Sequence, residues 1–347
     1  MRSWLLARLD FRPFQLSSAR QQSELGFIRR FGFNTRINLV KAHVRTFFAQ
    51  IIFVALLPAF AAEPIRFTSD DVVAFIGSGD TSAAQFSGHI ESLLARAFPE
   101  TKYRNFGWEG DTVFTQPRDF NFPPLKHHLK KAGVTVAFIQ FGRVEALSPE
   151  KADFTSAYLK FLAEIQEIVP TVILVTPIPF EKPSDPLPDL SAPNAALAEL
   201  SASIRAIGSE RKLKVIDLFS ALSNRKGKHL TEDGLQLTPF GHSVVALTFA
   251  QALNIPTNDQ ASTDGSWQDK ALERLRQTIV AKNQLWFNYW RPQNWAFLGG
   301  DRTEQPSSRD HRDPKVRWFP TEMEKYPELI VTREREIAAL AREIKEN

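Results

Sequence analysis

Short β-branched runs alternate with longer helical stretches from about Phe67 onward, and this alternation restricts the fold more than any other feature of the sequence. Strands that alternate with helices of ten or more residues form βαβ units, in which helices cover both faces of a parallel sheet. The sequence therefore predicts an α/β fold. We expect strands at Val72–Ile76, Tyr103–Phe106, Val134–Ile139, Val172–Val175 and Val215–Leu218, and helices at Phe86–Phe98, Phe154–Ile168, Ala192–Glu210 and Pro239–Leu253.

The composition changes after about Asn254, where the alternation stops. A polar linker precedes an expected helix at Lys270–Trp290, and the charged run Thr332–Lys345 predicts a terminal helix. The many aromatic residues near Trp290 favour packing of this extension over the core and loops, while a carbohydrate-stacking platform is the alternative. We expect a helical C-terminal extension at 256–347, after an α/β domain at 62–255.

The N-terminal leader carries a targeting pattern. A basic start at about residue 44, an apolar run and the terminus Ala59-Phe60-Ala61 are typical of a secretory signal peptide. The run falls short of the roughly 20 apolar residues of a membrane span, although a retained anchor is the alternative. We therefore expect export to the periplasm or the outside of the cell, with cleavage after Ala61. Residues 1–43 are then either an over-extended gene start or a basic cytosolic extension.

Charge and cysteine content exclude several classes of function. The net charge of +4 comes from residues 1–61, which hold nine basic and two acidic residues, so the remainder is slightly acidic and nucleic-acid binding is not expected. Without cysteine, disulfides, thiolate catalysis and Cys-based metal sites are excluded. The histidines and neighbouring acidic residues match no metal-ligand spacing. We therefore expect them to have surface or capping roles, and we expect no metal or cofactor. These residues are His127, His128, His229, His242, Glu109, Asp111 and Glu145.

Four loops should meet where parallel strands end, which is where ligands bind in such sheets. Their sequences are Phe75-Ile76-Gly77-Ser78-Gly79-Asp80-Thr81-Ser82, Asn105-Phe106-Gly107-Trp108-Glu109-Gly110-Asp111-Thr112, Phe141-Gly142-Arg143-Val144-Glu145, and Asp233 to His242. Together they resemble the SGNH, or GDSL-type, hydrolases over about half of the chain. The Trp-Glu-Gly-Asp-Thr run and the downstream Trp-Arg-Pro-Gln-Asn of residues 290–294 look like a secreted bacterial subgroup.

The resemblance implies a flavodoxin-like three-layer sandwich and ester hydrolysis by a serine, an oxyanion hole and an Asp-x-x-His pair. It places Gly107 at the backbone oxyanion position and Asp233 at the triad acid. Three other positions are substituted. Gly79 lacks the serine hydroxyl, Val144 lacks the asparagine donor, and the Gln236 amide has no basic site near neutral pH.

Two hypotheses about function therefore stay open. The first is a weakly active or inactive module that binds a small acylated or glycan ligand, or an unknown partner protein, in the former active-site cleft. The second is an ester hydrolase with a displaced nucleophile. Ser78 and Thr81, with Ser82 next to it, are the candidate nucleophiles, and His242 is the candidate base.

Overall fold

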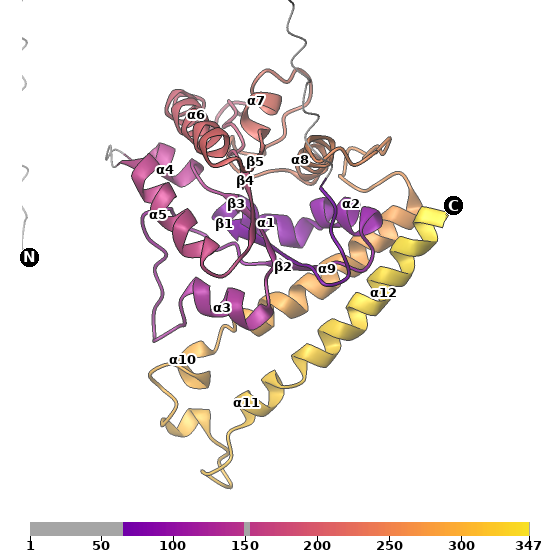
Figure 1. Cartoon of the computed structure of the whole chain (residues 1–347). Coiled ribbons are helices and arrows are strands. Elements are labelled where there is room, and N and C mark those ends of the chain that lie inside the picture. Colours follow the sequence, from indigo (N-terminus) through magenta and orange to yellow (C-terminus); the bar gives the residue numbers. More distant parts are fainter. Residues whose placement is uncertain (1–64, 149–152, 347) are drawn as a thin grey trace, which may run out of the picture. The chain divides into compact units, whose positions relative to one another are not determined.

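The computed structural model describes residues 65–148 and 153–346, so the predicted signal peptide at about 44–61 lies outside the described residues. Five parallel strands form one sheet in the order β2-β1-β3-β4-β5 (Figure 1). The predicted strands are confirmed. Their bounds are β1 Val72–Gly77, β2 Lys102–Asn105, β3 Val136–Gln140, β4 Thr171–Val175 and β5 Lys214–Ile216.

Helices cover both faces of this sheet and make a three-layer α/β sandwich. Successive residues of a strand point to opposite faces, so Val73 of β1 faces one hydrophobic core and Ala74 faces the other. Helices α2 (His89–Ala97) and α8 (Pro239–Ala252) cover the first face. The second face is covered by α3 (Leu125–Ala132), α5 (Phe154–Gln166) and α6 (Asn194–Arg211).

One helix prediction and one strand boundary need correction. The stretch expected as one helix at Phe86–Phe98 contains the end of α1 (Gly79–Ser87) and the whole of α2, separated by Gly88. Gly88 has φ +70°, a conformation that ends a helix and that side chains rarely adopt. The strand expected to reach Leu218 stops earlier, because the Asp217 carboxylate accepts a hydrogen bond from Ser220 N at 3.1 Å and starts α7 (Leu218–Ser223).

The C-terminal extension packs against the α/β part, as predicted, and it does so along the edge of the sheet. Helix α9 (Lys270–Trp290) lies beside the edge strand β2, and α12 (Tyr326–Glu346) runs along α9 (Figure 1). Lys282 Nζ donates to the carbonyl of Tyr103 at 3.1 Å, and Trp286 Nε1 donates to that of Asn105 at 2.8 Å. These side chains satisfy backbone groups that an edge strand otherwise leaves open to another chain.

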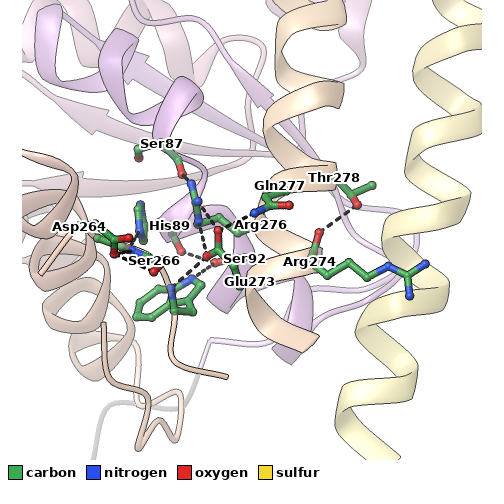
Figure 2. Close-up of polar contacts among 12 residues, drawn as sticks. Ser87, His89, Ser92, Asp264, Ser266, Glu273, Arg274, Arg276, Gln277 and Thr278 are labelled. Carbon is green, nitrogen blue, oxygen red and sulfur yellow. Dashed lines mark hydrogen bonds and ion pairs between the residues drawn. The ribbon is translucent and has the colours of Figure 1, made fainter. Parts of the chain in front are cut away.

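Buried polar contacts fix the position of α9. Lys282 lies 2.6 Å from Glu91 Oε1 on α2, and both side chains are buried. Near the start of α9, Arg276 Nη1 donates to the carbonyl of Ser87 at 2.7 Å while its guanidinium pairs with Glu273 (Figure 2). Leu272 of α9 belongs to the same core as the sheet. The extension and the α/β part therefore share one hydrophobic core.

The remaining helices are short. They are α4 (Arg143–Leu147), α10 (Trp295–Leu298), α11 (Trp318–Met323) and a 3-10 turn at Pro306–Ser308. Within residues 65–148 and 153–346, no helix has both the length and the apolar composition required to cross a membrane.

Candidate functional site

A cleft of about 520 Å³ opens beyond the carboxyl ends of β1 and β3. All four loops singled out in the sequence contribute to its wall, as the parallel sheet predicts. The residues that line it include Ser78, Gly79, Asp80, Ser82, Glu109, Gly110, Arg143, Val144, Leu235, Gln236 and His242.

The three substituted positions lie together on this cleft. Gly79 is the first residue of α1, and no other group lies within 4 Å of the position that a Cβ would take. Val144 belongs to α4 and presents an aliphatic side chain where the resemblance places an amide donor. Gln236 is exposed on the fourth loop. At these three positions the cleft therefore has no serine hydroxyl, no asparagine donor and no imidazole base.

The Asp233 carboxylate accepts hydrogen bonds from the backbone of its own loop. Its Oδ1 accepts hydrogen bonds from Leu235 N at 2.9 Å and from Gln236 N at 2.6 Å. Partial burial acts to raise the pKa of Asp233, but these backbone donors and the nearby Arg143 outweigh it and lower the pKa. The carboxylate thus stays charged and fixes the turn that carries Gln236.

Gly107, which the resemblance places at the backbone oxyanion position, is held within its own loop. Its N–H donates to Asn105 Oδ1 at 2.8 Å and is therefore occupied within the loop. A Cβ at Gly107 would lie 2.3 Å from Ser82 N, so the glycine is required for close packing against α1. Gly107 does not line the cleft, whereas Gly110 of the same loop does.

The three candidate hydroxyls differ in position. Ser78 lines the cleft and is 8% exposed. Thr81 is buried, and its Oγ1 lies 3.3 Å from Gln140 Oε1 beneath the loop, outside the cleft lining. Ser82 is also buried and donates to Glu109 Oε1 at 2.6 Å. Of the three, Ser78 is the one that both faces the cleft and lacks an observed carboxylate or amide partner for its hydroxyl.

His242 lines the cleft from the first turn of α8. Burial lowers the pKa of His242 to about 4, against an opposing effect of the nearby Asp80. The imidazole is therefore neutral at physiological pH. Within the part of the chain that the structure describes, no imidazole nitrogen forms a hydrogen bond with a serine or threonine hydroxyl, which is the contact that a Ser-His pair requires.

The sequence interpretation missed a buried ion pair in the cleft. Arg143 is 4% exposed, and its Nη1 lies 2.5 Å from Asp80 Oδ1 and 2.9 Å from the carbonyl of Leu235. The guanidinium also lies over the Phe180 ring at 4.6 Å. Arg143 thereby joins the first, third and fourth loops. The sequence offered one signal for this pair, which was an arginine directly before Val144 in the third loop.

The C-terminal extension also reaches the cleft. Arg291 Nη1 lies 2.7 Å from Glu109 Oε2, and its guanidinium stacks on the Trp108 ring at 3.7 Å. Burial acts to raise the pKa of Glu109, but the Ser82 hydroxyl and Arg291 together lower it. The Trp-Glu-Gly run and the Trp-Arg-Pro-Gln-Asn run, which are far apart in sequence, are therefore in direct contact at the cleft wall.

The buried Glu145 carboxylate connects the second and third loops. Glu145 is buried, with Oε1 accepting from Val113 N at 2.9 Å and Oε2 accepting from Gly142 N at 2.8 Å. Burial raises the pKa of Glu145 despite these donors.

Within the described ranges, no three His, Cys, Asp or Glu side chains are grouped so that they would hold a metal ion.

The sequence model of the GDSL-like lipase/acylhydrolase family matches residues 70–244, which is half of the chain and includes all four loops. The chain belongs to this family. The match ends two residues after His242, so α9 and α12 lie outside the part that defines the GDSL-like family.

Several solved structures are similar to this chain, and the first has a fold in common with it. A gut microbial diltiazem-metabolizing enzyme has a TM-score of 0.51 and 10% identity over 81% of this chain and 96% of its own. A variant of an acetylxylan esterase from Geobacillus stearothermophilus has a TM-score of 0.42 and 15% identity over 55% of this chain and 98% of its own. A lipolytic G-D-S-L family member from Veillonella parvula has a TM-score of 0.42 and 14% identity, over 52% of this chain and 96% of its own. Comparison with curated proteins gives no match.

Proposed function

We propose that this GDSL-like protein is an exported binding module with little or no esterase activity. The observation that carries the proposal is the meeting of Gly79, Val144 and Gln236 on one cleft. Loss of one oxyanion donor alone typically costs about 100- to 1,000-fold in kcat. Here the nucleophile and base positions are substituted as well, and such groups act as a unit.

The chemistry of the cleft favours a neutral ligand with an apolar part. Its charged groups pair with one another, Arg143 with Asp80 and Glu109 with Arg291. Phe86 and Leu147 add exposed apolar surface to the lining. A small acylated molecule, such as an acylated sugar, offers an apolar acyl group and uncharged oxygens, so we assign this class of ligand to the cleft.

An assay of ester hydrolysis tests the proposal. The protein from Ala62 onward is incubated with short-chain aryl acetates and, separately, with a serine-reactive phosphonate. We expect no turnover above the buffer rate and no covalent labelling. Binding of an acetylated xylo-oligosaccharide, measured by calorimetry and weakened by Val144→Trp, would support the binding role. Val144→Trp fills the cleft from α4 without changing any charge.

The second candidate function is ester hydrolysis by a displaced nucleophile. It is favoured by the presence of Ser78 and His242 on the same cleft, with Asp80 close enough to affect the imidazole. Ser78→Ala distinguishes the two proposals. If the wild type hydrolyses aryl acetates and Ser78→Ala abolishes this, the hydrolase proposal is correct and the binding-only proposal is wrong.

A further inference from the structure

A second cavity, of about 350 Å³, lies between α3, α9, α10 and the start of α12, on the side of the extension. We name it the aromatic cavity after Trp286, Tyr289, Trp290 and Trp295, which line it. It shares no lining residue with the cleft among the residues that the structure describes. Its volume falls within the roughly 300–1,000 Å³ of small-molecule sites, which are mostly apolar with a few placed polar groups.

The tryptophans of the aromatic cavity differ in how their N–H groups are satisfied. Trp286 Nε1 donates to the Asn105 carbonyl at 2.8 Å, and Trp295 Nε1 donates to the Phe120 carbonyl at 2.9 Å. Trp290 is 4% exposed, and its Nε1 has no hydrogen-bond partner in the described chain. A buried donor without a partner is costly, by about 1–3 kcal/mol.

An unpartnered acceptor accompanies this donor. The His128 ring lies 5.6 Å from the Trp290 ring between centroids, and its Nε2 also has no partner within the described residues. The backbone of Pro123, whose only polar group is its carbonyl, acts to raise the pKa of His128 and so favours a proton on the ring nitrogen nearest to it. Because Nε2 has no partner, we assign this proton to Nδ1, which leaves Nε2 as an acceptor. Burial lowers the pKa of His128 to about 4, so the acceptor form persists near neutral pH.

We propose that the aromatic cavity is a second ligand site, and that it binds a ring compound carrying a hydroxyl group. A hydroxyl is both donor and acceptor, so one such group satisfies His128 Nε2 and Trp290 Nε1–H together. The aromatic walls provide apolar contact for the ring. A cationic ligand is disfavoured, because Arg104 and Lys131 line the same cavity. A sugar residue and a phenol both have this chemistry.

Ligand-observed NMR with the full chain tests the proposal and distinguishes the two sources. The probes are cellobiose and xylobiose for sugars, and p-cresol for phenols, with 4-methylanisole as the analogue whose hydroxyl is capped. We expect saturation transfer to at least one hydroxylated probe at millimolar concentration. If p-cresol binds, 4-methylanisole should bind at least about tenfold more weakly, as expected for loss of a buried hydrogen bond.

Two substitutions locate the site. Trp290→Phe keeps an aromatic ring and removes the N–H, and His128→Phe keeps a ring beside Phe122 and removes the acceptor. Each should weaken binding about fivefold or more. Trp318→Phe is the matched control, because Trp318 lies outside the cavity and bonds Asp310 on the surface. The proposal is overturned if no hydroxylated probe binds the wild type, or if neither Trp290→Phe nor His128→Phe weakens the binding.

Discussion

Arg143 Nη1 lies 2.5 Å from Asp80 Oδ1 on the wall of the cleft, in a side-chain pair whose arginine is 4% and whose aspartate is 18% exposed. Asp80 follows the substituted nucleophile position and Arg143 precedes the substituted oxyanion position. The first and third loops of the cleft are thus held together by a charge pair that lies beside two of the substituted positions. This arrangement fixes the shape of the cleft.

Breaking this pair should destabilise the fold. Arg143→Met removes the charge and keeps an aliphatic chain, leaving Asp80 without its partner, and we expect a loss of about 2–3 kcal/mol in the free energy of unfolding. The double variant Arg143→Met/Asp80→Asn should recover at least about 1 kcal/mol of it, because no charge is left unpaired. Urea unfolding measures both values.

Lys126→Met provides the control for this cycle, because the pair of Lys126 with Glu167 is exposed. Exposed pairs contribute little, so this substitution should change the free energy of unfolding by less than about 1 kcal/mol. Equal effects of Arg143→Met and Lys126→Met would show that the buried pair does not hold the loops.

Removal of the extension should expose the edge of the sheet. Truncation after Asn254 deletes α9 and α12, which uncovers β2 and the core residues that Leu272 and Ile337 cover. We expect a lower melting temperature and increased binding of a hydrophobic dye. A melting temperature equal to that of the intact chain would show that the extension is independent.

Acid should weaken the fold through buried histidines. Burial lowers the pKa values of His89, His128 and His242 to about 4. Since an unfolded histidine titrates near 6.5, the unfolded state binds more protons between about pH 6.5 and 4. The free energy of unfolding should therefore fall as the pH is lowered through this window.

His89→Gln tests this pH dependence at one position. His89 Nε2 lies 2.7 Å from the Gly265 carbonyl in the contact between α2 and the linker (Figure 2). Glutamine keeps a donor but does not titrate, so the slope of the free energy of unfolding between pH 6 and 5 should become smaller. His311→Gln, at an exposed histidine, is the control. An unchanged slope in His89→Gln would contradict the assignment.

Export remains a prediction from the leader sequence. If the signal peptide is cleaved after Ala61, N-terminal sequencing of the protein from the cell envelope or medium should start at Ala62-Glu63-Pro64. Recovery of a chain that still carries Arg2 to Ala61 would show that the leader is retained.

Periodicity predicted the five strands and the long helices, because these segments are buried on regular faces. Periodicity did not predict the boundaries that depend on single residues. Gly88 divides α1 from α2 through its positive φ, and Asp217 ends β5 by capping α7. The eight-residue α3 is rich in Lys and His, so its buried face of Leu125 and Leu129 is too short to give a clear period.

The site was predictable in place but not in detail. The alternation of strands and helices located the cleft, because loops that follow parallel strands meet at one edge of the sheet, and the resemblance to GDSL-type hydrolases pointed to three positions that line it. Neither could show that Gly107 packs against Ser82, because that depends on the distance between two loops. The pairs of Arg143 with Asp80 and Arg291 with Glu109 join residues 63 and 182 positions apart, which a local pattern does not reveal.

The aryl-acetate assay of the wild type beside the triple variant Gly79→Ser/Val144→Asn/Gln236→His tests the central claim most directly. Open space at Gly79 admits a serine side chain, and the three positions already share one cleft. We predict no turnover above buffer for the wild type and for each single variant, and measurable turnover for the triple variant, because the groups act as a unit. Hydrolysis by the wild type that is lost on Ser78→Ala, Thr81→Ala or Ser82→Ala would contradict the account.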